Sequence, residues 1–201
     1  MSIGYPIEIS LVIPTFNEEG NVLRLYNEIK QVLLELQIAH YEVIFIDDGS
    51  SDASLERIED LRAQDANVHF LQLSRNFGHQ HALKAGLDHA SGAAVISLDA
   101  DLQHPPALIK DMIQLWRNGA EVVYTRRKDQ QNIGIFKKWS AKAFYWFANK
   151  ISEVPIEEGT ADFRLLDQKV VAAIQTFKES HLFLRGLIPT LGFKQVALDY
   201  E

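Results

Sequence analysis

Five short apolar runs, rich in β-branched residues, alternate with helix-like segments over the first 125 residues. The runs cover residues 8–13, 42–47, 68–73, 93–98 and 121–125. The helical segments between them cover about 19–36, 52–64, 79–90 and 105–117. Strands that alternate with helices need right-handed crossovers, which predict a mostly parallel sheet. The sequence therefore predicts an α/β fold, a Rossmann-like sheet flanked by helices on both faces.

The rhythm changes after residue 125. A long helical stretch, a loop around 154–160, a helix near 167–178 and a short last strand at 196–200 are expected there. There is no internal repeat and no linker, and 201 residues suit one domain. We expect a single domain over 1–201, with a nucleotide-binding half over about 1–125 and an acceptor-facing half over about 126–201.

Composition excludes several classes of function. The absence of cysteine rules out disulfides, thiolate metal sites and a cysteine nucleophile. A formal charge of −7 argues against a nucleic-acid binder. The sequence also lacks the phosphate-binding loop G-x-x-x-x-G-K-[ST], a G-x-G-x-x-G after the first strand, and the hydrolase motifs G-x-S-x-G and H-E-x-x-H.

The charge is unevenly distributed along the chain. Residues 1–100 hold 6 Lys+Arg and 15 Asp+Glu, a net −9, whereas residues 101–201 hold 14 and 12, a net +2. Seven basic residues and one acid lie between positions 126 and 150. This split suits a protein that handles an anionic substrate through a metal, or one that rests on an anionic membrane surface.

Polar clusters follow four of the predicted strands where each strand ends. They cover residues 14–18, 47–50, 74–78 and 99–101. In an open parallel sheet, ligands bind at the carboxyl ends of the strands. The four clusters are therefore expected to converge on one site.

Asp99 and Asp101 directly follow an apolar strand. Two exposed carboxylates at such a position suit a hard divalent cation that also binds substrate phosphates. The alternative is a solvated turn that caps the next helix. Asp48, Asn17 and Glu18 allow the same pair of interpretations, helix capping or contact with a nucleoside. His79 and His81 are interpreted as surface or packing residues, because their spacing is poor for joint metal binding on a helix.

Together these motifs resemble the family 2 inverting glycosyltransferases with a GT-A fold, and most closely the polyprenyl-phosphate group that includes the dolichyl-phosphate mannose synthases. The resemblance covers nearly the whole chain. It is carried by Pro14-x-x-Asn17-Glu18, Asp47-Asp48-Gly49-Ser50-x-Asp52, Arg75-Asn76-x-Gly78, Asp99-x-Asp101-x-Gln103-His104-Pro105 and Ala161-Asp162-Phe163-Arg164-Leu165.

The resemblance implies metal-dependent transfer of a sugar from a UDP- or GDP-sugar to a polyprenyl phosphate. Asp99 and Asp101 would bind Mg²⁺ or Mn²⁺, with Asp101 also counted as catalytic. Asp162 would be the general base or a positioning group. The residues implied to bind the donor are Pro14, Asn17, Glu18, Asp48, Arg75, Asp99 and Gln103.

An anionic acceptor also needs cations, and Arg126, Arg127 and Arg164 are the candidates because guanidinium groups bind phosphate bidentately. Residues 134–151 have the pattern of an amphipathic helix with aromatic residues and lysines, which suits a membrane interface or a core-facing helix. We expect a protein at the cytoplasmic face of a membrane. Many relatives carry transmembrane helices after this domain, so we also expect the full-length protein to continue into such an anchor.

Three other functions stay open on the sequence alone. The acceptor could be a saccharide hydroxyl instead of a lipid phosphate. A sugar-1-phosphate nucleotidyltransferase also uses acidic metal sites, although residues 14–20 are acidic where that class has a basic, glycine-rich loop. The third alternative is a nucleotide-sugar-binding module without catalytic activity.

Overall fold

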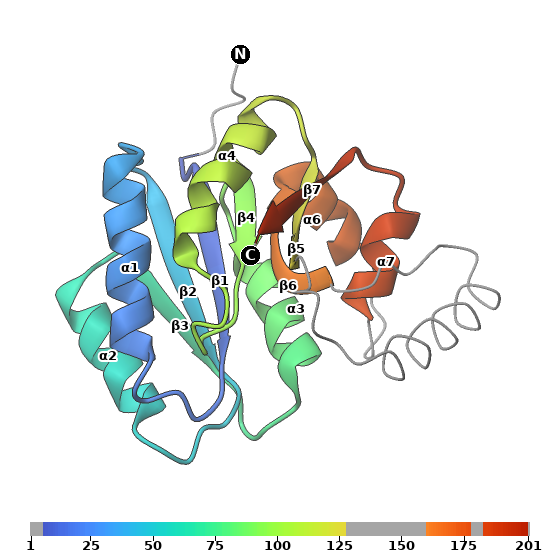
Figure 1. The fold of residues 1–201 in the computed structure, drawn as a ribbon. Coiled ribbons are helices and arrows are strands. Elements are labelled where there is room, and N and C mark those ends of the chain that lie inside the picture. Colours follow the sequence, from blue (N-terminus) through green and yellow to red (C-terminus); the bar gives the residue numbers. More distant parts are fainter. Residues whose placement is uncertain (1–5, 128–159, 178–182, 201) are drawn as a thin grey trace, which may run out of the picture.

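The computed structural model describes residues 6–127, 160–177 and 183–200, which form a seven-stranded sheet covered by helices (Figure 1). The strands are β1 (Ile9–Thr15), β2 (Tyr41–Asp47), β3 (Val68–Gln72), β4 (Ala94–Ser97), β5 (Val122–Arg127), β6 (Thr160–Asp167) and β7 (Gln195–Tyr200). The helices are α1 (Val22–Glu35), α2 (Ser54–Gln64), α3 (His79–His89), α4 (Ile109–Arg117), α6 (Gln168–Gln175) and α7 (Leu184–Thr190), with a 3₁₀ turn, η1 (Pro106–Leu108).

The strand order is β3-β2-β1-β4-β6-β5-β7. The pairings β1–β2, β1–β4, β2–β3 and β5–β7 are parallel, and β6 is antiparallel to both of its neighbours, β4 and β5. The prediction of a mostly parallel α/β sheet is therefore confirmed. The five predicted strands of the first half are all present, with ends within about two residues of those expected.

Two apolar layers bury the faces of the sheet. On one face, side chains of α1, α2 and α4 pack against alternate residues of β1 such as Ile9, Leu11 and Ile13. On the other face, α3 packs against the strands β1 and β2, which carry the intervening residue Val12 and its neighbours, and side chains of α6 and α7 belong to the same apolar layer. This alternation follows from the two-residue period of a strand, and it explains why the strands read as continuous apolar runs.

Two elements differ from the sequence-based prediction. Residues 160–167 form a central strand, although we expected a loop to reach residue 160 and a helix to begin near 167. The segment mixes Asp162 and Arg164 with apolar residues, so it lacks the pattern of a buried strand, and pairing with β4 and β5 imposes the strand conformation. The helix α7 was not expected either, because it contains Gly186 and Pro189.

The predicted amphipathic helix over 134–151 lies outside the described residues. Within the described residues, none of the helices combines the length and the apolar character needed to cross a membrane.

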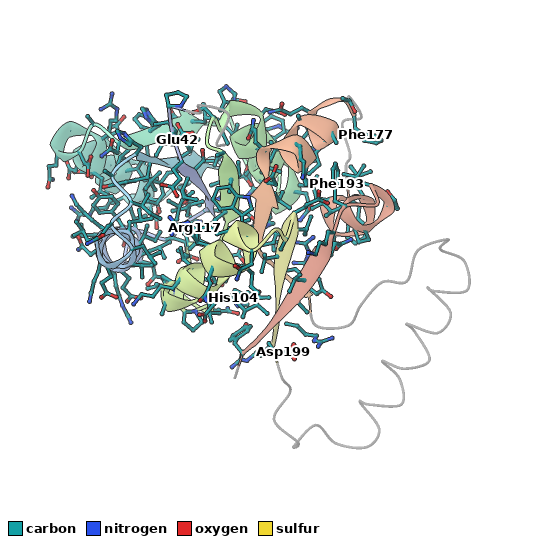
Figure 2. All side chains as sticks on the ribbon, turned by 90° about the horizontal axis from the view of Figure 1, so that it is seen from above. Glu42, His104, Arg117, Phe177, Phe193 and Asp199 are labelled. Atoms are coloured by element: carbon teal, nitrogen blue, oxygen red, sulfur yellow. The ribbon has the colours of Figure 1, made fainter. Side chains whose placement is uncertain are left out.

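The amino ends of the central strands are fixed by a buried carboxylate. Glu42 of β2 is 8% exposed and accepts hydrogen bonds from the Ser10 hydroxyl at 2.5 Å and from the Ser91 amide at 2.8 Å. Seen from above, Glu42 lies across the sheet from His104 and Asp199 (Figure 2). Hydroxyl and amide donors satisfy this carboxylate, so its role is to tie β1, β2 and the turn before β4 together.

A second carboxylate ties α1 to the end of α2. Asp65 follows α2 and accepts hydrogen bonds from the Tyr26 hydroxyl, from the Asn67 amide at 2.9 Å and from the Lys30 ammonium at 3.0 Å. Burial alone would raise the pKa of Asp65, but these donors outweigh it and lower the pKa to about 2. Burial and the hydrogen bond to Asp65 raise the pKa of Tyr26 to about 12, although Lys30 opposes this.

Asp65 therefore makes the free energy of unfolding depend on pH in the acid range. Its pKa is lower in the folded chain than the ordinary value of 3.8, so its contribution is complete above about pH 4 and is lost as the pH falls toward 2. The shift corresponds to about 2 kcal/mol. We expect Asp65→Asn to lower the free energy of unfolding by roughly this amount at pH 7 and to flatten its decline between pH 4 and 2, as measured by urea unfolding.

The control is Asp60→Asn, on an exposed position of the same helix α2. It should leave both the stability at pH 7 and the acid decline unchanged. An acid decline that is equally steep in Asp65→Asn and in the original chain would contradict this assignment.

Candidate functional site

The site lies at the carboxyl ends of β1, β2 and β4, where β6 enters the sheet from the opposite direction. The antiparallel register pairs Ser97 with Arg164. Continued by two residues, it places Asp99 opposite Asp162, although the two residues lie 63 positions apart in the sequence. The two carboxylates therefore meet because β6 is antiparallel.

Hydroxyl groups from both neighbouring strands fix the backbone around Asp162. The buried Ser97 donates to the Asp162 carbonyl at 2.5 Å, and the buried Thr125 donates to the Phe163 carbonyl at 3.0 Å. The β5–β6 register shifts between Tyr124 and Arg126, which places an irregularity at this point of β6. Such irregularities re-aim side chains next to functional sites.

The side chain of Asp162 is 3% exposed and surrounded by donors. Arg185 of α7 binds it with both arms, Nε to Oδ1 at 2.8 Å and Nη2 to Oδ2 at 2.7 Å. Gln80 of α3 donates to Oδ2 at 3.2 Å. His79 Nε2 lies 3.1 Å from the same oxygen. Three side chains from two helices therefore converge on one carboxylate.

These neighbours set the charge of Asp162. Burial by itself would raise the pKa of Asp162, but the contacts with His79 and Arg185 and the charge of Arg164 hold the pKa well below its usual range. Contact with Asp162 in turn raises the pKa of His79 against the effect of burial. The site thus contains a permanently ionised carboxylate matched by cationic groups.

Asp99 is in a different electrostatic position. Burial raises its pKa, and the negative charges of Asp162 and Asp101 add to this effect, whereas His79 opposes it. His79 Nε2 lies 3.5 Å from Asp99 Oδ1. Asp99 therefore lies where negative charge is concentrated and insufficiently balanced by the side chains around it.

The Asp99–Asp101 loop has a constrained backbone. Asp101 Oδ1 accepts the Gln103 amide at 3.0 Å, and Leu102 between them has φ 59°. A bulky residue in this region is strained and persists where packing holds it, and Leu102 packs against the core. His104 Nδ1 lies 2.5 Å from the Tyr200 hydroxyl, which ties the loop to the end of β7.

The carboxylates of Asp99 and Asp101 have the chemistry to bind a divalent cation. They are hard oxygen donors, and a cation would offset both the burial and the nearby negative charges of Asp162 and Asp101 that raise the pKa of Asp99. In the described part of the chain, His, Asp and Glu side chains do not gather in groups of three or more that could enclose a metal ion. One or two carboxylates, completed by substrate phosphates, is the arrangement typical of Mg²⁺.

The loops after β1 and β2 hold each other through side chains that were predicted to bind the donor. The side-chain Oδ1 of Asn17 accepts a hydrogen bond from the Ser51 backbone N–H at 2.8 Å. The backbone N–H of Asn17 donates to the Ser50 hydroxyl at 3.0 Å. The Glu18 amide donates to the Ser54 hydroxyl at 2.7 Å. These contacts link the two loops, whereas α1 and α2 begin at the N-cap residues Asn21 and Ala53 without a side-chain cap hydrogen bond. Nucleoside contact by Asn17 and Glu18 stays a prediction.

Asp48 connects this region to α3. It is 3% exposed, and its two oxygens accept the amides of Phe77 at 2.7 Å and Gly78 at 2.9 Å. Gly49 has φ 73°, and a Cβ there would lie 2.5 Å from the backbone of Arg75. The loops after β2 and β3 therefore touch backbone to backbone, and Asp48 fixes the start of α3.

The remaining predicted donor residues differ in accessibility. Pro14 is buried in β1, beyond the point where pairing with β4 ends. Arg75 is exposed and stacks over the Phe77 ring at 4.3 Å, and Gln103 is exposed beside the Asp99–Asp101 loop. Pro14 lies near the carboxyl end of β1, and Gln103 lies in the loop that follows the parallel strand β4. The fold therefore places both residues at the carboxyl edge of the sheet.

The predicted acceptor arginines are not equivalent. Arg126 forms a two-armed ion pair with Asp199 at 2.8 and 3.2 Å. Arg127, the last residue of β5, is exposed and pairs in register with Tyr200. Arg164 is only 5% exposed, and burial lowers its pKa while the charge of Asp162 opposes this.

Sequence reasoning missed three residues of the site. His79 was interpreted as a surface or packing residue, but the structure places it between two carboxylates. His79 and Gln80 directly follow the polar cluster 74–78, which comes after β3. Because the carboxyl ends of the strands converge on one site, this position could have predicted that both residues lie near it. Arg185 carried none, since the segment around it contains glycine and proline and does not read as a helix.

Comparisons with known proteins agree with this geometry. The family model for glycosyl transferase family 2 matches residues 10–177. The uncharacterized glycosyltransferase YkcC of Bacillus subtilis is 41% identical over 194 residues, 96% of this chain and 60% of that protein. The bactoprenol glucosyl transferase of Shigella phage SfV is also 41% identical over 194 residues, 96% of this chain and 63% of that protein. The chain thus spans about six-tenths of the length of these relatives.

Solved structures show the same fold at low identity. The mannosyltransferase PcManGT of Pyrobaculum calidifontis, in complex with GDP-Man and Mn²⁺, has a TM-score of 0.68 and 16% identity and covers 97% of this chain and 55% of that one. TarS 1–349 of S. aureus with UDP has a TM-score of 0.63 and 18% identity, covering 97% and 59%. The fold, the family match and the identity to the relatives agree: the chain belongs to glycosyl transferase family 2 and has a GT-A fold.

Proposed function

We propose that this glycosyltransferase moves a sugar from a UDP- or GDP-sugar to a polyprenyl phosphate, with inversion at the anomeric carbon and with the help of Mg²⁺ or Mn²⁺. The observation that carries the proposal is the pairing of opposite charges around Asp162. Asp99 lies near Asp162 with negative charge around it, and Arg185 binds the Asp162 carboxylate directly. A relative at 41% identity is named a bactoprenol glucosyl transferase, and bactoprenol is a polyprenyl carrier.

The donor would lie along the carboxyl ends of β1, β2 and β4. Asp99 and Asp101 would hold the divalent cation, which supplies charge neutralisation for the departing diphosphate. Gln103 would assist at the diphosphate, and Asp48 with the 14–18 loop would surround the nucleoside. The mutual hydrogen bonds of the 17–18 and 50–54 loops support a rigid donor pocket, because they fix both walls before any ligand arrives.

The acceptor phosphate would meet the cationic side of Asp162. Arg185 is 42% exposed while anchored by Asp162, so it combines a fixed position with an accessible guanidinium. Arg164 is buried beneath and adds positive potential, and Arg127 lies at the open end of β5. Arg126, paired with Asp199, contributes less net charge. We therefore extend the predicted set of acceptor residues to Arg126, Arg127, Arg164 and Arg185.

Asp162 would position groups and would not accept a proton. Both of its oxygens are occupied by Arg185, with Gln80 and His79 at Oδ2, and these contacts stabilise the ionised form. A phosphate acceptor has a second pKa of about 6, so much of it is already a dianion at neutral pH. Such a nucleophile needs orientation more than deprotonation.

The lipid acceptor implies a membrane surface. A polyprenyl chain resides in the bilayer, so the enzyme would work at the cytoplasmic face. The seven basic residues among positions 126–150 would favour association with anionic lipid.

The first test concerns donor and metal. We expect one UDP- or GDP-sugar with Mn²⁺ to stabilise the chain by about 2.7 kcal/mol at a hundredfold excess over its Kd. For about 200 residues this is a rise in Tm of roughly 5–10 °C. Asp99→Asn and Asp101→Asn should each lose most of the rise, because the cation loses a ligand, and thermal unfolding measures it.

The matched control is Asp111→Asn, on an exposed position of α4, which should keep the full rise. The absence of a rise with every nucleotide sugar would refute donor binding. A rise that persists in the Asp101 variant would refute the metal assignment.

The second test concerns the acceptor. With the donor found above, radiolabelled sugar should move into the lipid fraction of vesicles that contain polyprenyl phosphate. Vesicles with the corresponding polyprenyl alcohol should accept none, because the proposed nucleophile is the phosphate oxygen. Label that appears only in a water-soluble saccharide would show that the acceptor is a sugar hydroxyl.

The third test concerns Asp162. We expect Asp162→Asn to lower kcat by roughly 100-fold through misplacement of the groups it holds. The rate of both proteins should fall on the acid side of about pH 6, where the acceptor phosphate gains its proton. Measurement of kcat/KM from pH 5 to 9 decides the matter: if the acid limb is present in the original chain and absent in the variant, Asp162 is the group that titrates and acts as a base.

A further inference from the structure

His79 is held in place by the start of its own helix. It is the first residue of α3, directly after Gly78, whose amide is bound by the Asp48 carboxylate at 2.9 Å. Further along α3, Gly86 allows close packing, since a Cβ there would lie 2.3 Å from Val12 of β1. The helix is therefore fixed at its start by a hydrogen bond and along its length by contact with the sheet.

From this position His79 reaches both carboxylates of the site. Its Nε2 lies 3.1 Å from Asp162 Oδ2 and 3.5 Å from Asp99 Oδ1. The nitrogen is buried. An imidazole nitrogen within 3.5 Å of an oxygen of each carboxylate can interact with both charges at once.

The other cations of the site do not serve this purpose. Arg185 binds both oxygens of the Asp162 carboxylate, with Nε on Oδ1 and Nη2 on Oδ2. His104 influences Asp99 electrostatically, but its Nδ1 is engaged with the Tyr200 hydroxyl. Without His79, Asp99 would lose the group that lies 3.5 Å from its Oδ1 and offsets the repulsion from Asp162 and Asp101, and its carboxylate would be free to move away from Asp162.

We propose that His79 is a positioning residue that holds the Asp99 carboxylate beside Asp162 and so fixes the distance between the metal-binding corner of the donor site and the cationic acceptor corner. The inference deepens the proposed function and rests on it. His79 acts through the two carboxylates and needs no contact with the sugar.

The first experiment compares His79→Ala and His79→Gln with the original chain. We expect His79→Ala to lower kcat by about 10- to 100-fold, as for a misplaced reacting group, with the acceptor KM and the Tm of the free protein nearly unchanged. His79→Gln should recover a large part of kcat, because its amide N–H reaches nearly as far as Nε2. His89→Gln is the matched control, since His89 is exposed at the other end of α3, and it should be unaffected.

A double-mutant cycle tests the route. If His79 acts through Asp162, His79→Ala should cost no more than about twofold in kcat when Asp162 is already Ala. Full, independent penalties in the double variant would overturn the proposal. An unchanged kcat in His79→Ala would also overturn it. So would a result in which His79→Ala and His79→Gln lose kcat to the same extent and lose Tm to the same extent, because this would mark a purely structural role.

A readout without the acceptor separates this inference from the proposed function. The apparent Kd of Mn²⁺ with the nucleotide sugar, from thermal-shift titration, should weaken about 3- to 10-fold in His79→Ala and less in His79→Gln, since disturbing a residue that orients a ligand costs at least this much. An unchanged Kd overturns the proposal. If no sugar reaches polyprenyl phosphate, the acceptor assignment fails, whereas this comparison still decides the role of His79.

Discussion

The site depends on one buried carboxylate and the charges that keep it ionised. Asp162 is 3% exposed, and an isolated charge at that depth would be protonated instead of buried. Arg185 binds both of its oxygens, His79 and Gln80 meet it from α3, and Arg164 lies nearby. The need to satisfy this carboxylate brings β6, α3 and α7 to one point, and it places positive charge next to the acidic Asp99–Asp101 loop.

The antiparallel strand explains how that point arises. In a wholly parallel sheet, only the ends of strands and the loops after them would lie at the carboxyl edge. Because β6 runs in the opposite direction, it begins at that edge and carries Asp162 as its third residue. Ser97 and Thr125 donate from either side to its backbone. In the proposed function, the loops after β1, β2 and β4 form the donor corner, and the beginning of β6 and α7 form the acceptor corner. His79, near both Asp99 and Asp162, would lie between them.

The site draws its charged residues from both halves of the sequence. Of the charged residues at the site, Asp99 comes from the acidic first half, and Asp101, Asp162, Arg164 and Arg185 come from the more basic second half. Asp99 thus lies near the negative charges of Asp101 and Asp162, whereas Arg164 and Arg185 stabilise the ionised form of Asp162. Glu42 and Asp65 show the contrast, because those carboxylates are satisfied by local donors and serve only to tie elements together.

The sequence by itself determined the α/β class, the five strands of the first half and the strand ends at which Asp48, Asp99 and Asp101 lie, because apolar runs and turn residues act locally. Its motifs also led to the family, which the comparisons confirm. Only the tertiary structure decided that residues 160–167 form a strand, that Gly186 and Pro189 lie in a helix, and that His79 and Arg185 belong to the site. These outcomes depend on pairing between distant segments and on the neutralisation of a buried charge, and neither leaves a pattern along the chain.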